Sequence, residues 1–275
     1  MDFKKILSNC EDISDEVVRK SRKILPPLGR ALLISTFIED GIRMFKSPAD
    51  HVDYFASGKH SWKFPFFIAC ILFLFCSLVQ IFGPIMIILR KKVIHAVCLL
   101  GAVLLIQTFV YNIYTDTRFL VRNVSIAGGL LLLLSESLLS NEKSLGSNQL
   151  PSTGEDIKPT SLMILLSRVY LVLMYLSIIH LDNASFLKII EYCISFVLVT
   201  CIVVGFKTKL FSLLLAILLF FMNFFVNNWL AETNTRYSDY MKYDFFQTLS
   251  VVGALLMLIH LGPGEISIDD YKKKW

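Results

Sequence analysis

The sequence is poor in charge and in the motifs of soluble enzymes. Charged residues fill 18% of its 275 positions, whereas a water-soluble domain usually carries about 25%. It contains no H-E-x-x-H, no phosphate-binding G-x-x-x-x-G-K-S/T, no G-x-G-x-x-G and no G-x-S-x-G. Its six cysteines form no C-x-x-C pair, and most lie within apolar runs. We therefore expect no catalytic residue, metal site, cofactor or enzymatic activity, and no nucleic-acid partner.

Apolar residues are abundant instead. They make up 55% of the chain, include 22 phenylalanines and give a mean hydropathy of +0.62. A spanning helix needs about 20 residues, because about 30 Å of hydrocarbon is crossed at about 1.5 Å per residue. The sequence therefore predicts an all-α polytopic membrane protein with about eight transmembrane helices. The apolar segments are 28–45, 64–89, 93–114, 119–139, 161–181, 186–206, 209–230 and 243–261.

The basic residues predict the orientation of the chain. Residues 1–25 lack the apolar core of a signal peptide and have apolar residues every three or four positions. They are expected to form an amphipathic helix, either on the membrane surface or against the protein's own cytosolic loops. This tail, the alternate loops and the C-terminus hold 16 Lys and Arg, against 7 in the opposite set. The positive-inside rule therefore places both termini in the cytosol.

The two halves of the chain look like repeats. Residues 118–133 resemble residues 242–257, pairing Asn123 with Gln247 and Gly129 with Gly253. An even number of segments in each half makes the repeats parallel. We predict a cytosolic segment 1–25, a four-helix repeat 26–139, a cytosolic linker 140–160, a second four-helix repeat 161–264 and a cytosolic tail 265–275.

Polar residues gather on the side opposite the termini, which this topology makes lumenal. Ionisable groups at membrane depth cost at least about 2.5 kcal/mol each, so they normally face a partner or a wet cavity. They suggest a binding vestibule open to the lumen. Glu39 and Arg43 are spaced i,i+4, and Asp40 and Arg43 are spaced i,i+3. A purely structural pairing within one helix fits this spacing equally well. The candidate binding residues are Glu39, Asp40, Arg43, Arg118, Arg122, Asn123, Lys242, Tyr243, Asp244 and Gln247.

Two short motifs concern trafficking and modification. The chain ends in Lys272-Lys273-Lys274-Trp275, with lysines third and fourth from the end. This is the dilysine retrieval pattern of proteins that the COPI coat returns from the Golgi; an ordinary basic tail is the alternative. Asn183-Ala-Ser185 is a glycosylation sequon, which we expect to stay unmodified because its loop is short.

Five stretches carry a resemblance to a known family: residues 33–44, 205–210, 242–248, 261–264 and the Lys-Lys-Lys-Trp end. Through them the sequence resembles the surfeit locus protein 4 family of endoplasmic reticulum cargo receptors. The resemblance implies a receptor that binds soluble lumenal cargo, often through the cargo's N-terminus, and loads it into COPII vesicles. Such a receptor cycles through the intermediate compartment and Golgi and returns by COPI. The family is similar to the bacterial DoxX group of four-helix membrane proteins.

Three functions remain open at this point. The first is a cargo receptor that contacts secretory proteins, coat components and membrane lipids. A transporter of small molecules or lipids in the early secretory pathway is the alternative, because membrane repeats with buried charge fit it as well. A membrane oxidoreductase is the weakest, because no haem or quinone ligand pattern is visible. The sequence leaves open whether the protein associates with itself or with other cargo receptors.

Overall fold

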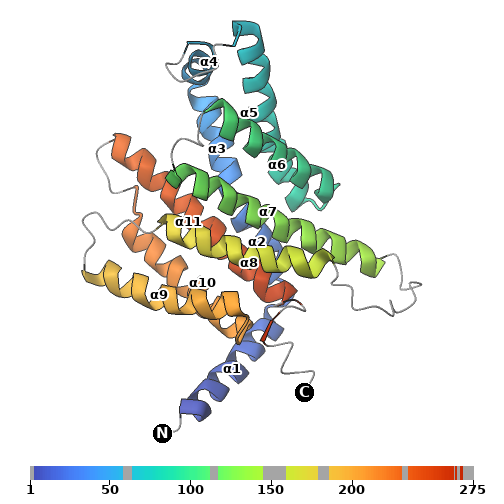
Figure 1. Cartoon of the computed structure of the whole chain (residues 1–275), viewed down its shortest axis with the longest axis vertical. Coiled ribbons are helices and arrows are strands. Elements are labelled where there is room, and N and C mark those ends of the chain that lie inside the picture. The colour runs from blue at the N-terminus through green and yellow to red at the C-terminus, as the bar shows by residue number, and fades with distance from the viewer. Residues whose placement is uncertain are drawn as a thin grey trace.

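The structure, a computed structural model, describes residues 3–57, 64–111, 117–144, 159–178, 186–230, 235–262, 264, 267 and 268. The regular secondary structure of these residues is helical throughout, which confirms the predicted all-α fold (Figure 1). The helices are α1 (Phe3–Lys20), α2 (Leu25–Leu33), α3 (Ser35–Lys46), α4 (Pro48–Ser57), α5 (Phe66–Ile88), α6 (Val93–Val110), α7 (Thr117–Ser144), α8 (Pro159–Ile178), α9 (Phe186–Val204), α10 (Thr208–Val226) and α11 (Thr235–Leu261).

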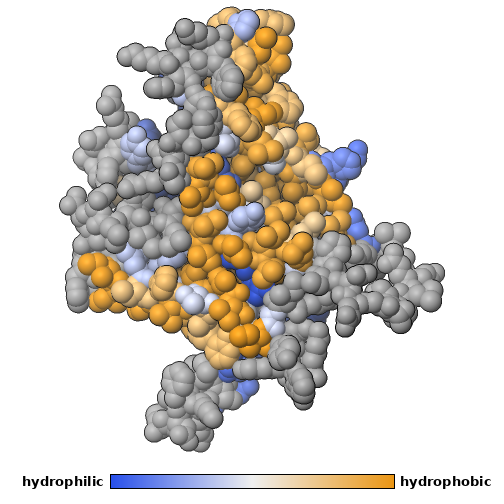
Figure 2. All heavy atoms as spheres, in the orientation of Figure 1, coloured by the Kyte–Doolittle hydropathy of each residue, from blue (hydrophilic) through white to orange (hydrophobic). Residues whose placement is uncertain are grey.

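Several of these helices have the length and composition of membrane spans. Large apolar side chains on them, such as Phe67 and Phe225, are exposed, and Figure 2 shows a broad hydrophobic surface over the bundle. A surface of this kind is stable only in lipid. The chain is a polytopic membrane protein, as predicted, and the total of eight spans stays a prediction. Within the described residues, five stretches qualify: Phe66–Ile88, Val93–Val110, Asn123–Asn141, Thr208–Val226 and Ser238–Leu261.

The first apolar segment, expected as one helix over 28–45, is two helices that meet at Ile34. Ser35 Oγ donates to the carbonyl oxygen of Leu32 at 2.6 Å, and Thr36 Oγ1 donates to the carbonyl oxygen of Phe246 in α11 at 3.2 Å. Bonds from serine and threonine side chains to the backbone compete with the helical ladder. The helix is therefore interrupted at a position that has neither glycine nor proline.

Helix α11 is the centre of the bundle, and it contacts α2, α3, α7, α8 and α10. Its Met257 is completely buried, and its Ser250 Oγ donates to the carbonyl oxygen of Leu33 at 2.7 Å. Gly253 lies so close to α2 that an added Cβ would be 2.3 Å from the backbone nitrogen of Leu33. Small residues allow this approach of two helix backbones, as in other membrane bundles. The packing on α11 fixes the position of α2 and, through it, of α3.

The same neighbour relations occur in both halves of the chain. In the first half α3 contacts α5, α5 contacts α6 and α6 contacts α7; in the second, α8, α9, α10 and α11 contact each other in the same order. The first helix of each half also contacts the last helix of the other, α2 with α11 and α8 with α7. Lys92 and Lys207, which precede α6 and α10, both have left-handed backbone conformations. Two parallel repeats would produce this pattern, although the division into repeats stays a prediction.

The two ends of the described chain lie at one end of the bundle. Lys207 at the start of α10 pairs with Glu11 of α1, and Lys209 lies 3.7 Å from Asp15 of α1. Beside them, a Cβ on Gly205 would be 2.6 Å from the Cβ of Ser267. Helix α1 runs crosswise to α9 below the bundle (Figure 1). Residues 269–275, including the predicted retrieval motif, lie outside the described residues.

Candidate functional site

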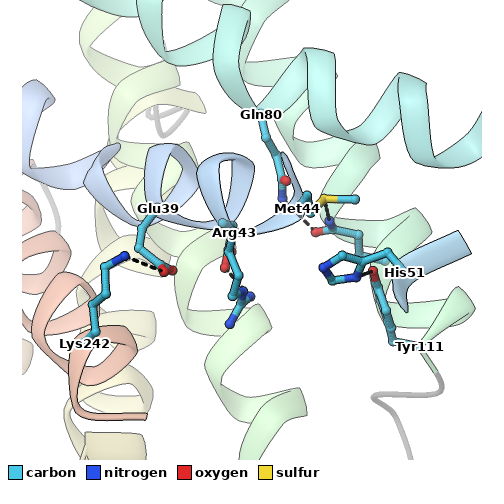
Figure 3. A network of polar contacts seen from close by, with 9 residues as sticks. Glu39, Arg43, Met44, His51, Gln80, Tyr111 and Lys242 are labelled. Atoms are coloured by element: carbon cyan, nitrogen blue, oxygen red, sulfur yellow. Dashed lines mark hydrogen bonds and ion pairs between the residues drawn. The ribbon is translucent and has the colours of Figure 1, made fainter. Parts of the chain in front are cut away.

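The candidate site lies at the other end of the bundle, between α3 and the first turns of α11. Glu39 and Lys242 point toward one another from these two helices (Figure 3). Glu39 and Arg43 are one helical turn apart on α3, which places both side chains on the face toward α11. Since α2 and α3 pack directly on α11, residues about 200 positions apart in the sequence meet here.

Glu39 is the most deeply buried acidic group of the site. Its side chain is 5% exposed, its Oε1 lies 3.7 Å from Lys242 Nζ, and its Oε2 has no hydrogen-bond partner. A hydrogen bond between an ammonium group and a carboxylate is about 2.7–2.9 Å long. The ion pair is thus too long for a hydrogen bond, and the carboxylate keeps unused acceptor capacity in a place where such groups are normally satisfied.

Lys242 lies between this carboxylate and two aromatic rings. Its Nζ is 5.6 Å from the ring centre of Trp229 and 6.0 Å from that of Phe246. A cation at about 6 Å over an aromatic face is attracted by the ring's quadrupole. The Lys242 side chain is 21% exposed, so it reaches from the open side of the site to the buried Glu39. Carboxylate and rings together define a position for one cation.

Asp40, the second acid of α3, forms a hydrogen-bonded ion pair. Arg43 donates to Asp40 at 2.6 Å, the pairing that the i,i+3 spacing suggested, and its guanidinium lies 5.1 Å from the ring centre of Tyr243 on α11. Arg43 therefore links α3 to α11 while it neutralises Asp40. The pairing of Glu39 with Arg43 that the i,i+4 spacing allowed is replaced by the pair with Lys242.

The structure describes some of the other predicted residues and leaves the rest undescribed. Asn123 Nδ2 donates to Thr108 Oγ1 at 3.0 Å, between α6 and α7. Gln247 is buried one turn along α11 from Tyr243, and Asp244 lies on the same helix. The side chains of Arg118 and Arg122 lie outside the described part of the structure, as does the sequon at Asn183. The role of all these residues as a binding site stays a prediction.

The sequence reasoning missed a polar network beside the site. His51 Nδ1 and the Tyr111 hydroxyl are 2.8 Å apart, Gln80 Nε2 donates to Gln107 Oε1 at 3.0 Å, and Gln107 Nε2 lies 3.6 Å from Met44 Sδ (Figure 3). His51 comes from α4, a helix in a stretch that had been expected as a loop. The three-residue spacing of Val52 and Phe55 was the available signal. Trp229 was missed too, although tryptophan is enriched at membrane interfaces.

Burial lowers the pKa of His51 below 6.5, and the positive charge of Arg43 lowers it further, while Asp50 opposes the shift. The imidazole is therefore neutral at neutral pH. The cation that faces α11 from this side of the site is Arg43.

A different charged cluster lies at the end of the bundle near α1. Arg30 donates through Nε to Glu136 Oε2 at 2.7 Å and through a second nitrogen to Oε1, and both side chains are buried. Arg90 lies 3.8 Å from the same carboxylate. Arg168 is completely buried as well. Arg30 is therefore paired within the protein, and Arg168 is enclosed by it.

The arrangement is suited to binding a cation. Within the described residues, no three of His, Cys, Asp and Glu lie close enough together to hold a metal ion. What the site provides is a buried carboxylate oxygen without a partner and two aromatic faces.

Comparison with known proteins decides the family. The SURF4 family model matches residues 4–275. The chain belongs to the SURF4 family. It is 37% identical to the Surfeit locus protein 4 homolog of Drosophila melanogaster over 98% of this chain and 97% of that protein. It is 31% identical to the ER-derived vesicles protein ERV29 of Saccharomyces cerevisiae over 98% of this chain and 84% of that protein. No solved structure matches.

Membership of the SURF4 family confirms the resemblance inferred from the sequence. Two of the stretches that carried it, residues 33–44 and 242–248, contribute Glu39 and Lys242. The long-range pair of the site is therefore built from two of the stretches that carry the resemblance to the SURF4 family.

Proposed function

We propose that this SURF4-family protein is a receptor for soluble secretory proteins in the lumen of the endoplasmic reticulum. It loads them into COPII vesicles and returns from the Golgi by COPI through Lys272 and Lys273; it catalyses no reaction. Family membership supports this role, because the yeast relative is named as a protein of ER-derived vesicles.

The arrangement of the two ends of the bundle supports the orientation that the role needs. Helix α1, the basic turn at Lys207 and Ser267 lie together at one end. Basic loops favour the cytosolic side. With that end in the cytosol, the retrieval motif meets the coat, and the site at Glu39 opens toward the lumen.

The single observation that carries the proposal is the unfilled carboxylate oxygen of Glu39. The terminal ammonium of an extended polypeptide has three donors, and charge-assisted hydrogen bonds to a carboxylate are among the stronger contacts in recognition. Asp40 is already bonded to Arg43, so Glu39 is the acceptor with capacity to spare. Apolar and aromatic side chains near it would hold the first residues of the cargo.

The test is secretion by cells that lack the protein and are complemented with variants. Glu39→Gln keeps the shape of the side chain and removes its charge, so cargo should be retained as in uncomplemented cells. Glu16→Gln is the matched control, because Glu16 also pairs with a lysine, Lys20 at 2.7 Å, at the opposite end of the bundle. Normal secretion with Glu39→Gln, at wild-type receptor abundance, would contradict the proposal.

One observation favours the alternative, transport of a small molecule or lipid. Gln80 is buried between apolar helices at 1% exposure, and its Oε1 has no hydrogen-bond partner. Polar groups at membrane depth often mark a transport path. Flux into vesicles that contain the purified protein, lost with Gln80→Leu, would support this function over the receptor.

A further inference from the structure

The ion pair between Glu39 and Lys242 is long for a pair with a buried carboxylate. Its atoms are 3.7 Å apart, whereas Arg43 and Asp40 are 2.6 Å apart and Lys20 and Glu16 2.7 Å. Those two pairs are more exposed than Glu39, although water competes for the charges there. A permanent buried pair is expected to be bonded more closely, because poor geometry leaves the desolvation of both charges uncompensated. The Lys242 ammonium is therefore suited to replacement by the ammonium group of another molecule.

The groups around the Lys242 ammonium would interact in the same way with an ammonium group of another molecule. Trp229 and Phe246 present ring faces to it, and Glu39 presents one oxygen at 3.7 Å and a second without a partner. Any primary ammonium group that entered would find the same charge and the same ring faces. Because such a group is not attached to α11, it could also come within hydrogen-bond distance of the Glu39 carboxylate.

Lys242 has a route out of this position. Its side chain is 21% exposed, and its four-carbon stem is flexible, whereas Glu39 is held inside. In the structure Glu39 is paired with Lys242, and Asp40 is paired with Arg43. Exchanging one ammonium for another leaves this balance unchanged, so no buried charge stays uncompensated.

We propose that Lys242 is an internal stand-in for the ligand: in the empty receptor its ammonium occupies the place that a primary ammonium of the bound polypeptide takes against Glu39. This rests on the proposed function. The ligand displaces Lys242 toward the open side and bonds both oxygens of Glu39 between the two rings. Competition by Lys242 weakens binding, which allows cargo to dissociate at its destination.

Binding of labelled decapeptides to the full-length protein in lipid nanodiscs tests this. One peptide has a free N-terminus and no lysine, the second is its N-acetylated form, and the third is N-acetylated with one internal lysine. With Lys242→Met the competitor is gone, and the free-amine peptide should bind about fivefold more tightly, the factor that corresponds to loss of an ion pair of about 1 kcal/mol. Lys242→Gln is the second variant should the methionine variant not fold.

A matched control comes from the other end of the bundle. Lys209 lies 3.7 Å from Asp15, the same distance as in the site pair, so Lys209→Met removes an equivalent lysine and should leave affinity unchanged. Glu39→Gln should abolish binding with and without Lys242. Binding of the first peptide alone assigns the chain terminus as the ligand, and binding of the third assigns a lysine side chain; either supports the stand-in.

Two results overturn the inference. The first is equal or weaker binding of the free-amine peptide when Lys242 is replaced, which would make the lysine part of the binding surface. The second is an equal gain for the acetylated peptide without lysine. In both cases a secretion defect with Glu39→Gln would leave the receptor proposal standing. Normal secretion with Glu39→Gln would reject the receptor proposal instead.

Discussion

Replacing Gly253 by alanine should force α2 away from α11. The added Cβ would lie 2.3 Å from the nitrogen of Leu33, 2.7 Å from the carbonyl oxygen of Gly29 and 2.8 Å from the carbonyl carbon of Leu32. All three are backbone atoms, so no side-chain rotation relieves the overlap. Because ordinary contacts begin at 3.4 Å, the two helices must separate by about 1 Å.

The cost follows from what this separation breaks. Overpacking at a helix contact costs about 1–3 kcal/mol. A shift of about 1 Å also lengthens the bonds from Ser250 to Leu33, now 2.7 Å, and from Thr36 to Phe246, now 3.2 Å, at about 1 kcal/mol each. Alanine's better helix propensity returns up to about 1 kcal/mol. The net loss is about 2–4 kcal/mol, which lowers the thermal midpoint by about 5–10 °C.

The assay is the thermal midpoint of the purified protein in detergent, followed by the change in tryptophan fluorescence. Gly101→Ala in α6 is the control, because the nearest atom to its added Cβ is 4.0 Å away, on Leu130. This variant should unfold at the wild-type temperature or slightly above it. If Gly253→Ala did the same, α2 and α11 would not be packed as closely as described, and the contact that positions Glu39 would be in question.

Two further predictions concern the end of the bundle near α1 and the C-terminus. Arg30→Met leaves the buried Glu136 with only the more distant Arg90 at 3.8 Å, and Glu136→Leu leaves Arg30 buried without this carboxylate. Each should cost about 3–5 kcal/mol, and the double variant should recover most of it. Thermal midpoints measure this, and additive losses would contradict the pairing. Replacing Lys272 and Lys273 together by alanine should move the protein from the endoplasmic reticulum to the Golgi in cell imaging, while Lys274→Ala should not. Retention of the double variant in the endoplasmic reticulum would count against retrieval.

The parts of the fold that depend on local sequence could be predicted. Long apolar runs identify helices such as α5 and α10, and the i,i+3 spacing of Asp40 and Arg43 indicated their pairing. The interruption at Ile34 could not be read in the same way, because it depends on a bond from Thr36 to Phe246, which is distant in the sequence. Helix α4 was missed because it is short and lies between two of the predicted apolar segments.

The pair of Glu39 and Lys242 could not be predicted from local sequence either, because it also depends on residues that are distant in the sequence. Glu39 and Arg43 are spaced for an ion pair within α3, and nothing in that spacing says that Lys242 takes the glutamate. The choice is made by the approach of α2 and α11 at Gly253, a contact between different parts of the chain. Sequence patterns supplied the residues of the site, and helix packing determined their partners.

Glu39 and Glu136, two buried carboxylates among the described residues, show how geometry separates a structural charge from an exchangeable one. Glu136 receives two nitrogens of Arg30, and the planar guanidinium matches both of its oxygens. Glu39 receives one flexible ammonium at 3.7 Å and keeps an oxygen without a partner. Both are buried, so burial alone does not identify a binding site. The saturated pair lies where the helices must stay together, and the unsaturated one lies where a ligand with its own ammonium can complete it.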